Sequence, residues 1–350
     1  MPFFIVENDI TKMNTECIVV SADVSLHPVG GMSTALFDAV EEPENLLREC
    51  ELIGFCGGCE CVTTRSYGLP SKYIIHSVAP LFADSKNRAE EYLKTCYKNA
   101  IYMARRKMFE SLAVPLIGTG KKGYPKDMAV KVAMEVIEGF LNKYDMNIYF
   151  VVKNKSSFIA DKTLAKKLED YIADHYRDNS AEVFVSNNSF ADSFTVDGTV
   201  FGDFSVNEVG FKTVDNLENT GITKSENLND SEETGKDIDF TQILKATLKR
   251  HKVRDGVAYK KSNIEKFAFA RFKNNIDYKP KKEAVLGIAV ALEMDLTETE
   301  SFLKQAGYEF SNKNKSDVIV KYFIENRIYN IFTINQMLFH FGENQLGALV

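Results

Sequence analysis

The chain reads Ile117-Gly118-Thr119-Gly120-Lys121-Lys122-Gly123-Tyr124-Pro125 between an apolar run, residues 112–117, and a helical pattern, residues 126–140. Glycines in such a loop accept a positive φ and let backbone N–H groups come close to a ligand. The positive end of the helix that follows favours an anion at the same place. In open α/β sheets, ligands bind where strands end in loops of this kind. The sequence therefore predicts an α/β fold with an anion-binding loop at residues 117–125.

A second glycine-rich loop, Val29-Gly30-Gly31-Met32-Ser33, lies between an expected strand at 17–21 and an expected helix at 33–40. Ser33 is of the residue type that caps a helix N-terminus. Two such loops at the carboxyl ends of parallel strands can clamp a diphosphate from both sides. Neither loop has the spacing of a P-loop or of the dinucleotide motif GxGxxG, so neither of those folds is indicated.

Strand-like and helix-like segments alternate over residues 1–176. Short β-branched and apolar runs predict strands at 3–7, 17–21, 61–64, 72–78, 112–117 and 147–152. Amphipathic spacing predicts helices at 33–40, 88–108, 126–140 and 162–175. This order predicts a largely parallel or mixed sheet with helices on both of its faces.

Five motifs, in this order, resemble those of the macro domain family. Residues 8–11 are similar to the family's GDIT, 18–23 to AIVNAAN, 30–36 to GGGVDGAI, 75–80 to IHTVGP and 117–125 to IGTGxxGYP. The resemblance implies that residues 1–176 form a three-layer α/β/α macro domain with a mixed sheet. It also implies that the ligand is ADP-ribose, or an ADP-ribosylated protein or nucleic acid, and that no cofactor is needed.

The same resemblance implies roles for single residues. Asp9 is expected to accept a hydrogen bond from the adenine amino group, with Ile10 beside it, and Tyr124 is expected to pack against the ligand. The residues expected to bind the ligand are Asp9, Ile10, Ser21, Asp23, Gly30, Gly31, Met32, Ser33, Gly118, Thr119, Gly120, Lys121, Lys122, Gly123 and Tyr124. Two structural alternatives stay open: Asp9 as an ordinary turn carboxylate, and Tyr124 with Pro125 as a hydrophobic staple at a helix start.

Macro domains include passive binders and hydrolases, and the sequence departs from one hydrolytic pattern. Val20 occupies the position of the first Asn of NAAN, and Asp23 that of the second. Ser33 occupies the position of the acid in the family's GGGVDGAI motif. Loss of a general base costs about 10²- to 10⁴-fold in rate. Asp23 keeps an acceptor for a ribose hydroxyl or a water and is the candidate catalytic residue. The sequence thus favours a passive binder, with an ADP-ribosyl hydrolase or O-acetyl-ADP-ribose deacetylase as the alternative.

A second hydrolytic branch of the family uses a Lys together with a nearby Asp. Lys121, Lys122 and Asp127 offer those residue types. The sequence does not align them with the site of that branch, so this alternative also stays open.

All six cysteines lie in the first hundred residues, and Cys56-x-x-Cys59-x-Cys61 has the spacing of half a zinc site. No second CxxC or HxxxH follows, and His76 is the nearest further donor in the sequence. We expect His76 to be a core strand residue rather than a base. We interpret the cysteines as free thiols in a packed turn and strand, and expect no metal.

The composition, 45% hydrophobic and 26% charged, is that of an ordinary globular protein. No stretch approaches the roughly 20 apolar residues of a membrane span. The start, MPFFIVENDI, lacks the basic and apolar regions of a secretory signal. We therefore expect a cytoplasmic protein that has no membrane partner.

The net charge of −6 hides two oppositely charged segments. Residues 178–239 hold 14 acids against 3 lysines, and their low apolar content predicts a flexible acidic linker at 177–238. The phenylalanines that recur in this segment are interpreted as weakly interacting side chains of a disordered chain. The alternative is that the segment adds to one of the domains or covers the ligand-binding cleft. Residues 241–282 hold 13 Lys or Arg against 3 Asp or Glu, which indicates a different partner for this segment.

Helical periodicity returns over residues 239–350 and predicts a separate all-α domain. Helices are expected from residue 240 and at 257–262, 266–274, 281–293, 298–306, 316–326 and 334–341. Thr297 with Glu300 has the pattern of a capping box, and Gly307 stands where a helix should stop.

Residues 255–307 resemble the helix-turn-helix domain of phage-repressor-type regulators. The resemblance implies DNA as a partner, with residues 266–273 as the recognition helix. The basic residues expected to meet phosphates are Lys260, Lys261, Lys266, Arg271, Lys273, Lys281 and Lys282. The alternative is a solvated basic face on a module that binds a protein partner or dimerises. A further alternative for the whole chain is an ADP-ribose-responsive nucleic-acid-binding regulator.

Overall fold

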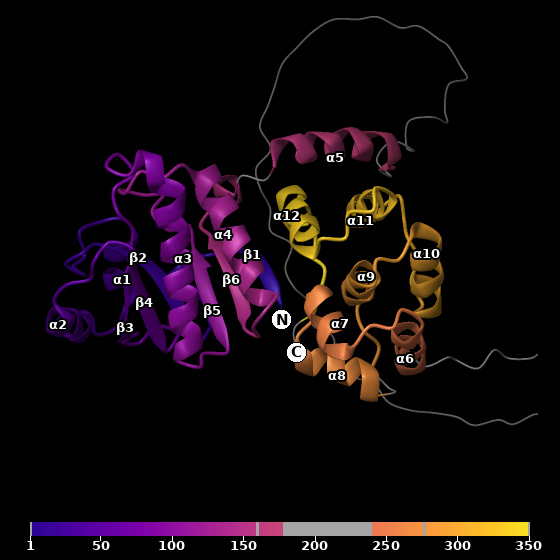
Figure 1. Cartoon of the computed structure of the whole chain (residues 1–350), viewed down its shortest axis with the longest axis horizontal. Helices are drawn as coiled ribbons and strands as arrows, with labels where there is room; N and C mark the ends of the chain where they lie inside the picture. The colour runs from indigo at the N-terminus through magenta and orange to yellow at the C-terminus, as the bar shows by residue number, and fades with distance from the viewer. Residues whose placement is uncertain (1, 159–160, 178–239, 276–277, 349–350) are drawn as a thin grey trace, which may run out of the picture. The chain divides into compact units, whose positions relative to one another are not determined.

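The computed structural model describes residues 2–158, 161–177, 240–275 and 278–348. The described residues on both sides of the gap at 178–239 belong to one compact unit. Figure 1 labels their helices and strands. The acidic linker expected at 177–238, with its recurring phenylalanines, lies outside the described residues apart from Arg177.

A six-stranded sheet forms the N-terminal part, with the strand order β1-β6-β5-β2-β4-β3. Its strands are β1 (Phe3–Glu7), β2 (Cys17–Ala22), β3 (Cys61–Arg65), β4 (Tyr73–Val78), β5 (Ser111–Pro115) and β6 (Asn147–Val152). Neighbouring strands run parallel except β3, which pairs antiparallel with β4. The predicted mixed sheet is confirmed, and each predicted strand is found within two residues of its expected bounds.

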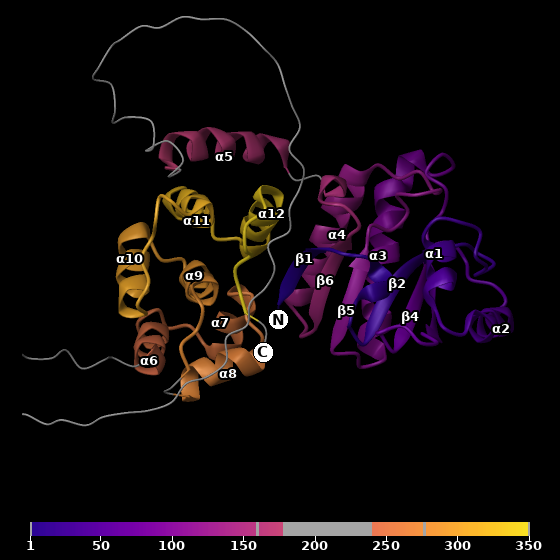
Figure 2. The same cartoon turned by 180° about the vertical axis from the view of Figure 1, so that it is seen from behind.

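Helices cover both faces of this sheet, as the front and back views show (Figure 2). The helices are α1 (Met32–Ala39), α2 (Pro43–Ile53), α3 (Ala89–Arg106) and α4 (Lys126–Leu141). Successive side chains of β2 point to opposite faces. Ile18 and Val20 therefore pack with α1 and α2, whereas Val19 packs with α3 and α4. The result is the predicted three-layer α/β/α arrangement.

α2 was not predicted from the sequence. It begins at Pro43, a residue suited to the first turn of a helix. Only Leu46 and Cys50 are buried, however, and the other positions are mostly charged or exposed. Two buried positions make too narrow an apolar stripe for periodicity to identify.

The C-terminal part is all-helical, as predicted. Its helices are α6 (Phe240–Arg250), α7 (Asp255–Lys261), α8 (Lys266–Asn274), α9 (Lys282–Ala291), α10 (Leu296–Gln305), α11 (Lys315–Glu325) and α12 (Ile331–Phe341). Every residue of α9 from Ala284 to Ala291 is buried, which places this helix inside the bundle. In the described ranges, none of the helices combines the length and the apolar character that crossing a bilayer requires.

α5 (Lys162–His175) belongs to this bundle by its contacts. The sequence predicted the helix correctly but assigned it to the sheet domain. Tyr171 of α5 packs its ring against Tyr322 of α11, and its hydroxyl donates to Glu325 over 2.7 Å. α5 therefore follows the sheet in sequence but stabilises the helical part.

The predicted cap of α1 was wrong. The helix begins at Met32 and its N-cap is Gly31, with a φ of 64°. Ser33 lies two residues after the N-cap, and its hydroxyl donates to the Gly30 carbonyl over 3.0 Å. Glycine can take this N-cap conformation, which a residue with a β-carbon resists.

The predicted cap of α10 was also wrong. The N-cap is Asp295 rather than Thr297, and its carboxylate accepts from the Glu298 N–H over 2.8 Å. Asp is at least as good an N-cap residue as Thr. The other end agrees with the prediction, since Gly307 follows the helix with a φ of 77°.

β1 is an edge strand, so the backbone groups on its outer side have no partner strand. Two side-chain amides from the C-terminal part take that place. Asn263 accepts from the Phe3 N–H at 2.6 Å and donates to the Phe3 carbonyl at 2.9 Å. Gln345 does the same for Ile5, at 3.0 and 2.7 Å. We call these four hydrogen bonds the amide ladder.

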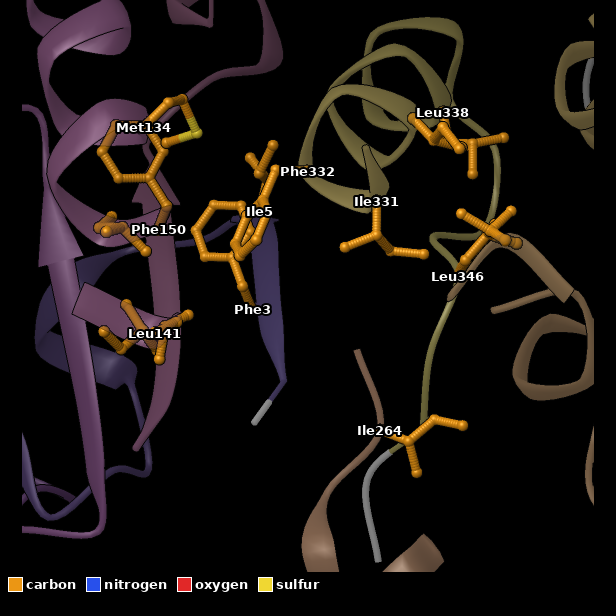
Figure 3. Close-up of a cluster of buried hydrophobic side chains, with 14 of the residues drawn as sticks. Phe3, Ile5, Met134, Leu141, Phe150, Ile264, Ile331, Phe332, Leu338 and Leu346 are labelled. Carbon is orange, nitrogen blue, oxygen red and sulfur yellow. The ribbon is translucent and has the colours of Figure 1, made fainter. Parts of the chain in front are cut away.

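Apolar side chains surround the amide ladder. Phe3 and Ile5 lie beside Ile331 and Phe332 of α12, and all four are buried (Figure 3). The rings of Phe3 and Phe332 have their centroids 5.4 Å apart. A backbone group left without a partner in such surroundings costs about 1–3 kcal/mol. The amide ladder therefore removes a cost that burial of this edge would otherwise impose.

Replacing Asn263 by Gly should lower the free energy of unfolding by about 2 kcal/mol or more, because Phe3 loses partners for both of its backbone groups. Gly is the suitable replacement because Asn263 has a φ of 58°, where a β-carbon adds strain. Urea unfolding measures the effect. The matched control is Asn344→Gly, since Asn344 is exposed and its side chain bonds, within the described part of the chain, just the Glu283 side chain. Equal losses in the two variants would contradict the assigned role of the amide ladder.

Candidate functional site

A cavity of about 490 Å³ lies between the loops that follow β2 and β5. These strands are parallel neighbours, so their carboxyl ends meet at the same edge of the sheet. The lining residues are Ser21, Ala22, Asp23, Val29, Gly30, Gly31, Met32, Ser33, Leu81, Leu116, Gly118, Thr119, Gly120, Lys121 and Lys122. Both glycine-rich loops predicted from the sequence are among them.

Several residues that line this cavity have backbone N–H groups without a hydrogen-bond partner among the described residues. On the first loop, the N–H groups of Gly30, Gly31 and Met32 have no hydrogen-bond partner among the described residues. On the second loop, the same holds for the N–H groups of residues 119–122. Unpaired N–H groups at the start of a helix, as at Met32 of α1, form a site for an anion, and unpaired N–H groups of successive loop residues can do the same. Two such groups of donors on one cavity suit a ligand with two linked anionic centres.

Two glycines in these loops are required by the geometry. Gly118 has a φ of 77°, and a β-carbon there would lie 2.8 Å from the ring of Tyr124. Gly30 has a φ of 106°, and a β-carbon there would meet the Lys121 side chain. Both positions combine a backbone conformation that favours glycine with a close neighbour. The glycines therefore set the loop shape as well as leaving room for a ligand.

Tyr97 of α3 fixes where the second loop begins. Its buried hydroxyl accepts from the Ile117 N–H at 2.9 Å and donates to the Pro115 carbonyl at 3.2 Å. Burial raises the pKa of Tyr97, so the hydroxyl keeps its proton. The tyrosine thus satisfies two backbone groups at the point where β5 ends, a role that no sequence motif had indicated.

Two lysines of the second loop reach across to the first. Lys121 donates to the Val29 carbonyl, and the Lys122 ammonium lies 2.9 Å from Oδ1 of Asp23. The hydrogen bond from Lys122 holds the pKa of Asp23 below its usual value, so this carboxylate is ionised at neutral pH. Among the described residues that line the cavity, these three are the charged ones.

The structure brings eleven of the predicted ligand-binding residues to the cavity. They are Ser21, Asp23, Gly30, Gly31, Met32, Ser33, Gly118, Thr119, Gly120, Lys121 and Lys122. The sequence had not singled out Ala22, Val29, Leu81 and Leu116, which also line it. Each of these four directly adjoins or lies inside a quoted motif, and this adjacency is the signal that could have identified them.

Four predicted residues do not line this cavity: Asp9, Ile10, Gly123 and Tyr124. Asp9 caps a short 3-10 helix, and its carboxylate accepts from the Thr11 N–H at 3.0 Å and hydroxyl at 2.8 Å. Tyr124 is 2% exposed and lies behind Gly118, with its ring edge-on to Phe82. Oδ1 of Asp9 thus holds a turn, while the contact of Asp9 with an adenine amino group stays a prediction, and Tyr124 supports the second loop from inside.

The residues that replace one hydrolytic pattern offer little acid–base chemistry. Val20 is fully buried in the core with α1 and α2. The hydroxyl of Ser33 already donates to the Gly30 carbonyl. The carboxylate partner of Lys122 is Asp23 rather than Asp127. The arrangement is therefore better suited to holding an anion than to activating a water.

His76 is a core residue, as predicted. It is 2% exposed, and its Nε2 lies 2.8 Å from the Thr64 hydroxyl. Burial lowers the pKa of His76 to about 4. Within the described ranges, no three His, Cys, Asp or Glu side chains are arranged to hold a metal ion. Cys56 is buried, and Cys59 and Cys61 are half-buried.

His76 should make the protein less stable in mild acid. The unfolded chain binds a proton below a pKa of about 6.5, whereas the folded chain resists it down to about 4. Stability should therefore fall by about 1.4 kcal/mol per pH unit between these values, in addition to other groups' contributions. Urea unfolding at pH 7 and pH 5 measures this, with His76→Gln as the control that lacks the titration. An identical pH dependence in both proteins would contradict it.

The basic residues predicted to meet DNA phosphates are partly engaged within the chain. The ion pairs are Lys260 with Asp145 at 3.3 Å, Lys261 with Glu293 at 3.0 Å, Lys273 with Asp255 at 2.6 Å and Lys282 with Asp317 at 2.5 Å. Lys266, Arg271 and Lys281 form no ion pair with any described residue. The turn between α7 and α8 contains Asn263, which the amide ladder holds against β1.

Comparison with known proteins identifies the part of the chain that carries the cavity. A family model described as Macro domain matches residues 19–133. A macro domain-containing protein of Methanosarcina mazei is 34% identical over 166 residues, which are 47% of this chain and 88% of the relative. An O-acetyl-ADP-ribose deacetylase of Salmonella typhimurium is 33% identical over 153 residues, 42% of this chain and 84% of the relative. The solved structure of an Oceanobacillus iheyensis macrodomain with ADP is 30% identical, covers 49% of this chain and 90% of that one, and has a TM-score of 0.42.

Proposed function

The chain belongs to the macro domain family, and we propose on this basis that the cavity between its two glycine-rich loops binds ADP-ribose, either free or attached to a macromolecule. The observation that supports this most directly is the unpaired backbone N–H groups on both loops. An ADP-ribose molecule carries a diphosphate between two ribose units. Donors from two sides can hold such a diphosphate without any side chain.

The cavity supports this proposal by its shape and its charge. Its volume of about 490 Å³ lies in the range of ligand pockets. Its three charged side chains, Asp23, Lys121 and Lys122, sum to one positive charge, which favours an anion. Tyr97 and Tyr124 fix the second loop from inside, so part of the site is formed before the ligand arrives.

Replacing Gly120 by Val should weaken ADP-ribose binding at least tenfold, because the added side chain would occupy the cavity. Gly120 has an ordinary φ and no atom within 4 Å of a β-carbon, so the fold should tolerate the change. The control is Gly139→Val, since Gly139 also has free space around it but lies on α4 outside the cavity. Calorimetry with ADP-ribose measures both variants. If wild type shows no binding of ADP-ribose at millimolar concentration, the proposed function is refuted.

A second candidate function is hydrolysis of an ADP-ribosyl or O-acetyl-ADP-ribose ester bond. The relative of Salmonella typhimurium that is named a deacetylase favours it. Asp23 is the candidate catalytic residue, but its carboxylate is held by Lys122. We favour passive binding because neither Val20 nor Ser33 supplies a base.

The hydrolase alternative predicts release of free ADP-ribose from an ADP-ribosylated protein, with loss of at least 10²-fold in rate on Asp23→Ala. Passive binding predicts no release above the rate in buffer. Chromatography of the released nucleotide separates the two outcomes. Release that persists unchanged in Asp23→Ala would leave hydrolysis possible but remove the role assigned to Asp23.

For the helical part, we propose internal support of the sheet rather than DNA binding. Lys260 and Tyr259 both bond Asp145, which lies between α4 and β6, and Asn263 bonds β1. In the turn before α8, Ser262 and Asn263 are buried, and Asn263 is bonded to β1, so this turn is held within the chain. Lys266 and Arg271 form a basic face without an ion pair to any described residue. We propose further that a protein partner could bind this face.

A further inference from the structure

Three segments of the chain meet beside the cavity, at the edge of the sheet where β2 and β4 end. Residues 23–31 follow β2, and residues 79–82 follow β4, which runs parallel to β2. Residues 54–60 precede β3. They reach the same edge because β3 runs antiparallel to β4, so that β3 begins where β4 ends.

Close contacts join these three segments. The Cys56 N–H donates to the Val24 carbonyl over 3.0 Å, which connects the segment before β3 to the loop after β2. A β-carbon at Gly58 would lie 3.6 Å from Pro80, so the segment before β3 also packs against the loop after β4. The three segments therefore form one continuous surface.

Large apolar side chains are exposed on this surface. Ten such side chains are exposed in the described ranges, and five of them lie on or next to the three segments. These five are Val24, Val29, Leu52, Phe55 and Leu81, and we call them the apolar patch. Leu52 is 83% and Phe55 70% exposed, so water contacts most of their surface. Single exposed apolar residues are ordinary, whereas a group of them typically marks a surface that binds a partner.

The apolar patch is continuous with the cavity. Val29 and Leu81 belong to the patch and also line the cavity, and they are 49% and 47% exposed. Leu52 and Phe55 lie outside the lining of the cavity. A ligand in the cavity therefore has exposed apolar surface beside it, and a chain attached to that ligand can contact this surface.

The charges around the apolar patch restrict the kind of partner. Residues 23–31, 51–60 and 79–85 contain neither lysine nor arginine. Three exposed acidic residues lie in the second and third of these ranges, namely Glu51, Glu60 and Asp84. A nucleic acid needs cations for its phosphates, and these ranges supply none. A polypeptide with apolar side chains fits the patch, and basic side chains beside them would fit its acidic border.

We propose that the apolar patch docks the polypeptide to which the ADP-ribosyl group is attached, through apolar side chains next to the modified residue. The cavity holds the nucleotide, and the patch binds the chain that carries it. Because both contacts act on one molecule, each raises the effective concentration for the other. This inference rests on the proposed function, and it adds that the site selects a modified polypeptide over free ADP-ribose and over modified nucleic acid.

The test compares free ADP-ribose with two peptides that carry ADP-ribose through a non-hydrolysable bond, by calorimetry on the full chain. One peptide has leucine and lysine beside the modified residue, and the other has serine and glutamate there. Wild type should bind the leucine peptide at least tenfold tighter than free ADP-ribose. The serine peptide should bind about as tightly as free ADP-ribose, because it offers the patch no apolar side chain.

Replacing Phe55 by Ser should remove most of the preference for the leucine peptide, since exposed aromatic side chains often dominate such contacts. The affinity for free ADP-ribose should stay unchanged, because Phe55 does not line the cavity. The matched control is Phe267→Ser, since Phe267 is also 70% exposed but lies on α8. This control should bind all three ligands like wild type. Thermal unfolding checks that each variant keeps its fold.

The outcomes separate the role of the patch from the proposed function. A wild type that binds none of the ligands removes the proposed function, and the docking role with it. If free ADP-ribose binds but both peptides bind alike, or if Phe55→Ser keeps the preference, the docking role is overturned and ADP-ribose binding stands.

Two further results would assign the patch to another partner and overturn the proposal. One is an ADP-ribosylated oligonucleotide that binds tighter than the leucine peptide. The other is a wild-type dimer, seen by sedimentation, that Phe55→Ser converts to a monomer, since the patch would then bind a second copy of the chain.

Discussion

The site depends on the pairing of β2 with β5. Cys17 lies opposite Leu112 and Ile18 opposite Ala113, in a parallel register. Because both strands run the same way, the loops that follow them leave the sheet at one edge, although they are far apart in sequence. An antiparallel pair would have sent one of the loops to the opposite edge, and no cavity would lie between them.

The donors of this cavity belong to the backbone, and this changes what the side chains must do. N–H groups at residues 30–32 and 119–122 are present whatever side chain the residue carries. The chain can therefore depart from the family's motif at Val20 and Ser33 without losing these donors. Of the side chains that line the cavity, Asp23 and Lys122 are paired with each other across the two loops.

The sequence was sufficient where a local pattern determines the structure. The strands and both glycine-rich loops were predicted correctly because β-branched runs and glycines act on their own residues. It was insufficient where the structure depends on residues far away in the chain. The bonds of Tyr97 to the end of β5, and the ion pair of Lys122 with Asp23, join segments that no periodicity relates.

The candidate site shows the same division. Most of the residues that the motifs named do line the cavity, because the motifs are contiguous and the cavity is made of loops. Tyr124 is the instructive exception, since a large aromatic next to glycines can face either the ligand or the core. Here a missing β-carbon at Gly118 makes room for its ring inside the protein. The side of a loop that a residue faces is set by packing, which the motif alone does not contain.

The amide ladder also bears on what the sheet would do without its helices. An uncovered edge such as that of β1 is a template on which another copy of the strand can add. The side-chain amides of Asn263 and Gln345 bond the backbone groups of this edge. Unlike a strand, a side chain offers no further row of backbone groups to which another strand could pair. The helical part thus prevents further strands from adding to β1. A chain shortened to the sheet part would expose this edge, and we expect it to associate with other copies through β1.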